Sequence, residues 1–142
     1  MILNRQKRVR VALPPLENFA RLVKRELRLN WREVAICLVS DAEMARLNKT
    51  FRGKNKPTDV LSFPAGRTPA FRWASSSRFL GDIAISPAMA KRNAGSYGRT
   101  VAEELRILIL HGVLHLMGYD HETDGGQMER RERRLRRRLG LE

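Results

Sequence analysis

The spacing of apolar residues predicts strands and helices that alternate along the first half of the chain. Residues 9–13 alternate as in a β-strand, and the proline pair at 14–15 is expected to end it. Residues 16–29 carry apolar side chains at helical spacing, and residues 33–40, EVAICLVS, form the apolar run of a buried strand. Two further strands are predicted at DVLSFP, residues 59–64, and LGDIAIS, residues 80–86.

Residues that accept hydrogen bonds from a first helical turn mark the predicted helix starts. Ser40 and Glu43 have the spacing of a capping box, as do Thr100 and Glu103. Ser86 precedes a proline, which suits the first position of a helix. Three helices are therefore expected to begin at these positions.

The order of these elements predicts the fold class. A last helix is expected between Asp124, a candidate cap, and Gly140, and residues 65–79 have the composition of an irregular loop. The order is then strand, helix, strand, helix, two strands and three helices. We expect an α+β fold with a small mixed β-sheet flanked by helices, formed by residues 1–142 as a single domain.

The charge of the chain is far from balanced. Twenty-eight Lys and Arg residues against fifteen Asp and Glu residues give a net charge of +13. Such a surface favours a polyanionic partner, which could be RNA, DNA, a ribonucleoprotein or an anionic membrane.

Cysteine usage and hydropathy indicate where the protein works. The single cysteine, Cys37, lies in an apolar run and is expected to be a buried hydrophobic residue. No signal-like segment opens the sequence, and the most apolar helix, near residues 105–117, is too short to span a bilayer. A cytoplasmic protein without membrane contact is expected.

All three histidines lie in HGVLHLMGYDH, residues 111–121. His111 and His115 are four residues apart, so a helix would place both rings on one face, close enough to share a metal ion. Gly118 permits a turn that would bring His121 back toward them. Three histidine ligands would leave a fourth position open, as in catalytic zinc sites. Core histidines bound to backbone carbonyls are the alternative, which three histidines at this spacing make the weaker one.

The same spacing occurs in metzincin proteases, H-E-x-x-H-x-x-G-x-x-H, but Gly112 stands where those proteases have their glutamate base. A peptidase of that mechanism is therefore disfavoured. Glu103 is expected in its capping box, and Glu104 lies about 10 Å before His111 along the helix axis. Asp120 could orient a ligand imidazole, although an ordinary turn residue explains it equally well.

The histidine segment resembles the signature of the YbeY family of bacterial rRNA maturation factors and single-strand-specific endoribonucleases. Two other stretches are similar to that family, LNKTFRGKNKPTDVLSFP at residues 47–64 and LGDIAIS at residues 80–86, as is the HETD…M…E pattern that follows His121. The resemblance covers about the last two-thirds of the chain.

This resemblance implies one zinc ion per chain, held by His111, His115 and His121 on and after a central helix, in a metzincin-like arrangement. It also implies processing of ribosomal RNA, notably at the 3′ end of the small-subunit 16S rRNA, and ribosome quality control. It also points to Arg52 as functionally important. The implied partners are single-stranded ribosomal RNA and the ribosome or its small subunit.

Basic residues supply the expected RNA contacts. Arg52, Lys54 and Lys56 lie on one short segment, where contact with phosphates is favoured over an ordinary solvated turn. Arg52 is the candidate catalytic residue because a guanidinium makes paired hydrogen bonds to phosphate. The seven arginines between residues 130 and 138 are also candidates for contact with ribosomal RNA, although a solvated helix face would carry a similar pattern.

Three functions remain open at this level. The favoured one is a metal-dependent endoribonuclease that serves rRNA maturation. The alternatives are a ribosome assembly factor in which zinc stabilises the fold without catalysis, and a metallopeptidase, which Gly112 disfavours.

Overall fold

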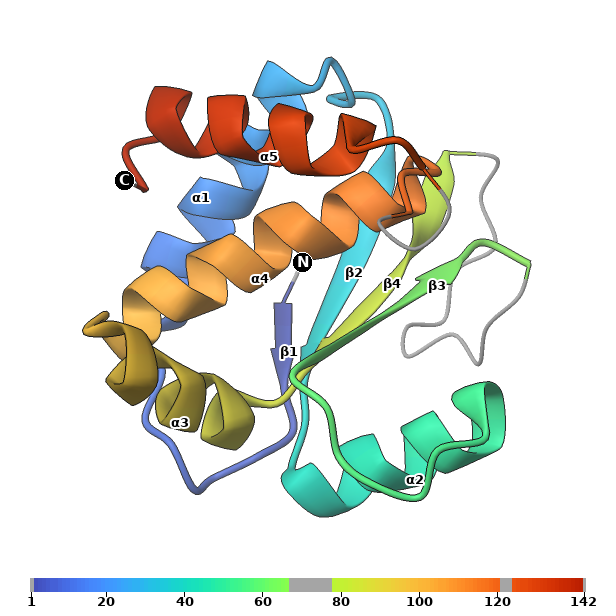
Figure 1. The fold of residues 1–142 in the computed structure, drawn as a ribbon, viewed down its shortest axis with the longest axis vertical. Coiled ribbons are helices and arrows are strands. Elements are labelled where there is room, and N and C mark those ends of the chain that lie inside the picture. The colour runs from blue at the N-terminus through green and yellow to red at the C-terminus, as the bar shows by residue number, and fades with distance from the viewer. Residues whose placement is uncertain (1, 67–77, 121–123, 142) are drawn as a thin grey trace.

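The computed structural model describes residues 2–66, 78–120 and 124–141. Along the chain, nine elements follow one another in the predicted order (Figure 1): β1 (Ile2–Asn4), α1 (Leu13–Glu26), β2 (Glu33–Leu38), α2 (Asp41–Arg52), β3 (Val60–Pro64), β4 (Phe79–Ile85), α3 (Pro87–Tyr97), α4 (Val101–Leu116) and α5 (Gln127–Arg138). The α+β class is confirmed. Among the described residues, no helix is both long enough and apolar enough to cross a membrane.

The four strands form one mixed sheet in the order β1-β2-β4-β3. β2 pairs in parallel with both β1 and β4, whereas β3 runs antiparallel to β4 at the edge. In β4 every residue is buried, while in β3 buried and half-buried residues alternate. This alternation is typical of a strand with one covered face, and it leaves the other side chains of β3 available to line a site.

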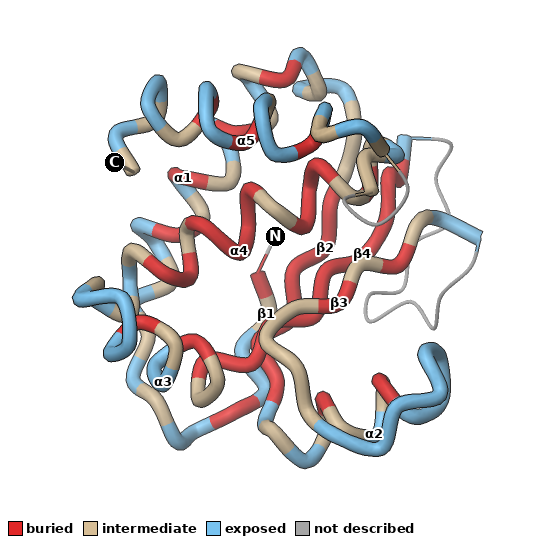
Figure 2. Tube along the Cα trace, in the orientation of Figure 1, coloured by how far each residue is buried: buried red, intermediate tan, exposed pale blue. Residues whose placement is uncertain are grey.

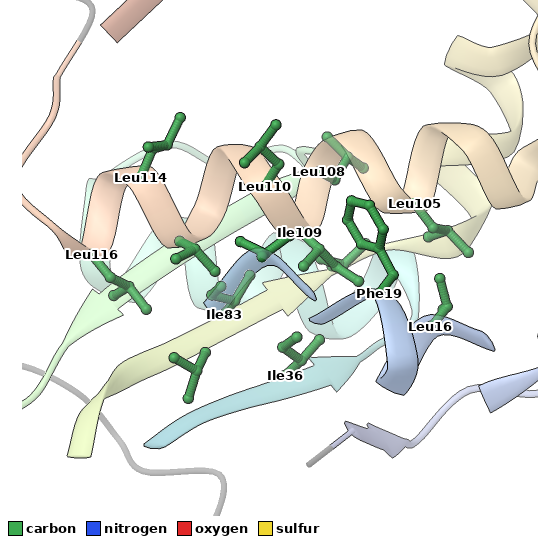
Figure 3. Close-up of a cluster of buried hydrophobic side chains, with 14 of the residues drawn as sticks. Leu16, Phe19, Ile36, Ile83, Leu105, Leu108, Ile109, Leu110, Leu114 and Leu116 are labelled. Atoms are coloured by element: carbon green, nitrogen blue, oxygen red, sulfur yellow. The ribbon is translucent and has the colours of Figure 1, made fainter. Parts of the chain in front are cut away.

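The sheet separates two clusters of buried apolar residues. The larger cluster lies between the sheet and the helices α1 and α4, where Ile36 and Ile83 face the leucines and isoleucines of α4 (Figures 2 and 3). The smaller cluster contains Met44 of α2, together with Cys37 and Ala84 from the sheet. Burial raises the pKa of the Cys37 thiol, so Cys37 is the buried hydrophobic residue that the sequence predicts.

The prediction for the first strand is wrong. Residues 9–12 form no strand, and β1 is instead Ile2–Asn4, paired with Ile36–Leu38. The prolines at 14–15 lie in the first turn of α1 rather than ending a strand. Proline suits that place because the first N–H groups of a helix have no intrahelical acceptor.

The predicted helix starts are confirmed, but one of the two predicted capping boxes is incomplete. The side chains of Ser40, Ser86 and Thr100 each accept a hydrogen bond from the first turn of the helix that follows. The capping box of Thr100 and Glu103 is complete, because each side chain accepts a hydrogen bond from the backbone N–H of the other residue. The hydrogen bond that Glu103 accepts from the backbone N–H of Thr100 lowers the pKa of Glu103. Glu43, by contrast, forms an ion pair with Arg5 at 3.0 Å.

Asp41 connects α2 with the start of α3. Its carboxylate accepts hydrogen bonds from Ser86 Oγ at 2.6 Å and from Arg92 Nη2 at 2.7 Å. Partial burial on its own would raise the pKa of Asp41, but these two hydrogen bonds outweigh it, and the pKa is lowered. This link fixes α2, and with it one wall of the site, relative to the rest of the fold.

Candidate active site

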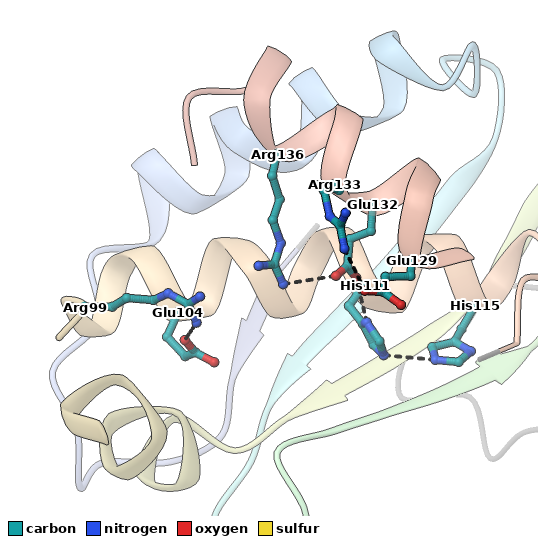
Figure 4. A network of polar contacts seen from close by, with 8 residues as sticks. All are labelled: Arg99, Glu104, His111, His115, Glu129, Glu132, Arg133 and Arg136. Atoms are coloured by element: carbon teal, nitrogen blue, oxygen red, sulfur yellow. Dashed lines mark hydrogen bonds and ion pairs between the residues drawn. The ribbon is translucent and has the colours of Figure 1, made fainter. Parts of the chain in front are cut away.

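Helix α4 places His111 and His115 on its side toward β3. Their Nε2 atoms are 3.0 Å apart, and the ring centroids are 4.6 Å apart (Figure 4). The helix ends at Leu116, and Gly118 adopts the left-handed conformation predicted for it, with φ +101°. The two rings thus direct one nitrogen each to a common point.

Glu132 of α5 holds the other side of the His111 ring. His111 Nδ1 donates to Glu132 Oε1 at 2.7 Å, and Arg136 donates to the second carboxylate oxygen at 3.0 Å. Glu132 is 8% exposed. Because a carboxylate can only accept from the ring, Nδ1 carries a proton, and Nε2 is the ring nitrogen of His111 that faces His115.

The third predicted ligand, His121, lies outside the described residues. Within residues 2–66, 78–120 and 124–141, no three His, Cys, Asp or Glu side chains gather as a metal site. The two described histidines nevertheless fit a metal ion. Nitrogens held tetrahedrally by zinc at about 2.0–2.1 Å lie roughly 3.3 Å apart, close to the 3.0 Å between the two Nε2 atoms.

Gly112 faces the sheet. A Cβ atom at this position would lie 2.9 Å from both Cδ1 and Cγ2 of Ile83 on β4. The carbonyl oxygen of Gly112 accepts a hydrogen bond from Ser62 Oγ on β3 at 3.1 Å. At the position where metzincin proteases have their glutamate base, this chain therefore has a glycine that lets α4 pack closely on the sheet.

This packing predicts the effect of the smallest substitution. Gly112→Ala is expected to lower the free energy of unfolding, because overpacking costs about 1–3 kcal/mol and exceeds the roughly 0.5–1 kcal/mol that alanine gains over glycine in a helix. Gly95→Ala in α3 is the matched control, since a Cβ there meets nothing within 4 Å, and it should stabilise the protein. Urea unfolding of both variants checks the prediction, which an unchanged stability of Gly112→Ala would contradict.

Arg52 is the last residue of α2, and its side chain extends into the site. Its Nη2 donates to the carbonyl oxygen of Ser62 at 3.0 Å, and its guanidinium carbon lies 5.9 Å from the centroid of the Phe63 ring. Ser62 is the same residue that binds the carbonyl of Gly112. One strand residue thus connects the arginine to the helix that carries the histidines.

The segment after α2 forms the basic rim of the site. Gly53, with φ +69°, ends α2 in a left-handed conformation, and the chain then turns through Lys54 and Lys56. Asn48, which is buried, donates to the carbonyl of Lys56 at 2.8 Å. This hydrogen bond fixes the loop from inside, a positioning role for Asn48 that the sequence pattern alone does not reveal.

A cleft of about 900 Å³ brings the described candidate residues together. Its lining includes the predicted Arg52, Lys54, Lys56, His111 and His115. Two carboxylates, Asp59 and Asp120, also line it. The cleft is thus a mainly basic depression with two imidazoles at its wall, a surface suited to a phosphate backbone.

Three α5 arginines form ion pairs; of these, Arg136 is half-buried, whereas Arg133 and Arg138 remain exposed. Arg136 binds Glu132 in the site, Arg133 pairs with Glu129 at 2.7 Å, and Arg138 pairs with Glu26 of α1 at 3.1 Å. The helix packs through Met128, Glu132 and Leu135. Sequence reasoning missed Glu132, although its spacing from Met128 and Leu135 placed it on the apolar face.

Asp124 stabilises the start of α5 from outside the helix. It lies two residues before the cap position and accepts from the backbone N–H groups of Gly126 and Met128. Glu104, in the first turn of α4, is buried and pairs with Arg99 at 3.0 Å.

Relatives of this chain by sequence share one name. The family model described as Endoribonuclease YbeY matches residues 1–140. A protein of that name from Solibacter usitatus is 44% identical over 90% of this chain and 80% of its own length. Another from Aquifex aeolicus is 41% identical over 94% of this chain and 85% of its own. The solution structure of TM1509 from Thermotoga maritima matches with a TM-score of 0.64 and 28% identity, over 98% of this chain and 89% of that one. The chain therefore belongs to the Endoribonuclease YbeY family.

Proposed function

We propose that this chain is a zinc-dependent endoribonuclease that cuts single-stranded ribosomal RNA during maturation of the 3′ end of 16S rRNA. Membership in the YbeY family supports RNA cleavage as the activity. The observation that carries the proposal is the pair of Nε2 atoms 3.0 Å apart at the wall of a cleft rimmed by Arg52, Lys54 and Lys56. The net charge of +13 supports a polyanionic partner, for which we propose the small ribosomal subunit, and the cytoplasm is the proposed location.

His111, His115 and His121 would hold one zinc ion. Three histidine ligands leave a coordination position for water or substrate, and a bound zinc ion supplies Lewis acidity at a phosphoryl oxygen and lowers the pKa of its water. Glu132 fixes the ring of His111 so that Nε2 points to the shared position. This arrangement is typical of histidine ligands in zinc sites.

The basic rim would bind and orient the RNA backbone. Arg52 is held at the carbonyl of Ser62 by one of its nitrogens, and a guanidinium has further N–H donors for a phosphate. Arg52 would stabilise the charge that develops on the phosphate during cleavage. Lys54 and Lys56 would contact neighbouring phosphates, which fixes register without reading sequence.

The position of Glu132 predicts a change in zinc affinity. Glu132→Gln should weaken zinc binding about 10–100-fold, because the amide loses the charge that stabilises the His111 N–H and turns an NH₂ group toward Arg136. Competition with a chromophoric chelator measures this affinity without any RNA. Glu129→Gln on the same helix is the control, since Glu129 is exposed and pairs with Arg133. Equal affinities of the two variants would rule out the role of Glu132.

The substrate test uses the zinc-loaded protein with three substrates: a single-stranded fragment spanning the 3′ end of precursor 16S rRNA, the same sequence as a duplex, and a casein-derived peptide. We expect internal cuts in the single strand, with the duplex and the peptide left intact. RNA binding without cleavage would favour the assembly factor instead, and cleavage of the peptide would favour a peptidase.

A further inference from the structure

The active-site cleft continues along α4 toward α3. A second pocket of about 430 Å³ adjoins it, and the two share Asp59, Val60, Asn93 and His111 as lining residues. The second pocket extends from His111 past Glu132 and Arg136 to Arg99 and Tyr97. A chain bound at the histidines can therefore pass into this pocket without leaving the groove.

Two arginines make the second pocket suitable for a phosphate. Arg99 pairs with Glu104 at 3.0 Å and Arg136 pairs with Glu132 at 3.0 Å, and these pairs lie on the same side of α4 as His111 (Figure 4). Each ion pair offsets the charge of one buried carboxylate, Glu104 or Glu132. The third carboxylate of the lining, Asp59, accepts from Asn93 Nδ2 at 3.3 Å and lies on the wall shared with the active-site cleft. Each guanidinium also keeps N–H donors beyond those of its ion pair.

Tyr97 gives this pocket an aromatic edge. It is the last residue of α3, it is 69% exposed, and the guanidinium carbon of Arg99 lies 4.9 Å from its ring centroid. Gly98 turns the chain through φ +67° between them and so places both residues at one rim. An exposed aromatic ring beside an arginine is the usual platform on which a protein stacks an unpaired base.

We propose that the second pocket is a nucleotide subsite that holds the nucleotide next to the cleaved bond, with its base on Tyr97 and its phosphate between Arg99 and Arg136. Asn93, on the shared wall, donates through Nδ2 to Asp59 at 3.3 Å, and its amide oxygen and second N–H would face the base or ribose. The proposal rests on the proposed function and deepens it. A base stacked on Tyr97 cannot remain paired in a duplex, so the subsite provides a physical reason for a single-strand preference.

The test measures binding rather than cleavage. Fluorescence anisotropy with a labelled single-stranded RNA, in the presence of a chelator, compares wild type with Tyr97→Ala and Tyr97→Phe. Loss of one stacked base is expected to weaken binding by about 5-fold or more, whereas the phenylalanine ring should keep the affinity within about 2-fold. Trp31→Ala is the matched control, because Trp31 is also exposed and has an arginine 4.8 Å from its ring centroid, but it lines neither pocket.

The outcomes separate the subsite from the proposed function. Tyr97→Ala binding that equals wild type, or a loss of the same size in Trp31→Ala, would overturn the subsite even if the wild type cleaves RNA. If the wild type binds RNA but does not cleave it when loaded with zinc, the nuclease proposal fails, while a specific loss in Tyr97→Ala still supports the subsite. Thermal unfolding of each variant verifies that the fold is intact.

Discussion

Replacing His115 with alanine is expected to reduce RNA cleavage to the level of a protein-free control while the fold remains intact. His115 supplies one of the two Nε2 atoms that converge at 3.0 Å. It is half-buried at the wall of the cleft, so its removal opens little of the core. Without it the predicted zinc site loses one of three ligands and most of its affinity.

Three measurements on His115→Ala check this result: the rate of single-strand cleavage, the zinc content after dialysis and the unfolding temperature. Arg106→Ala is the control, because Arg106 lies on the same helix, is half-buried and lines neither pocket. Cleavage that survives the loss of His115 would show that the reaction does not depend on the histidine pair.

Arg52→Ala is expected to lower kcat by about 10²–10³-fold, the usual cost of removing one group that stabilises transition-state charge. Zinc content should not change, because the contacts of Arg52 are to Ser62 and Phe63 rather than to the histidines. The kcat of Arg52→Lys should lie between those of wild type and Arg52→Ala, since lysine keeps the charge but loses the planar pair of donors.

Steady-state kinetics over a range of RNA concentrations separate the two roles open to Arg52, transition-state stabilisation and RNA binding. Arg46→Ala, on the exposed face of the same helix, should match wild type. A change in KM with an unchanged kcat in Arg52→Ala would assign Arg52 to RNA binding alone and contradict its catalytic role.

Much of the fold could be predicted because its signals are local. Ser40, Ser86 and Thr100 are capping residues that accept hydrogen bonds from backbone N–H groups within one turn, and all three start helices in the structure. The buried strand β2 shows as an apolar run after Glu33, and β4 ends in the apolar residues Ile83–Ile85, although it also contains Asp82. The prediction of the first strand failed because Ile2–Asn4 is short and is stabilised by pairing with β2, more than thirty residues away in the sequence.

The candidate site also contains residues that local spacing predicts and one residue, Glu132, that depends on the packing of distant elements. The spacing of His111 and His115 on a helix fixed their proximity, and the structure brings Arg52 into the same cleft. Glu132 could not be assigned because its contact with His111 depends on how α5 packs against α4. In a segment as rich in arginine as α5, a glutamate resembles one more surface ion-pair partner. The one available signal was its place between Met128 and Leu135, both buried.

The docking of α5 on α4 also sets the order in which the site is completed during synthesis. Glu132 follows His111 by 21 residues, so α4 can carry both imidazoles before α5 has packed and brought the carboxylate to His111. The fully oriented site therefore forms only after α5 has emerged from the ribosome and has packed on α4. A product that stops short of Glu132 would lack the carboxylate that orients His111, and we expect it to bind a metal ion less tightly.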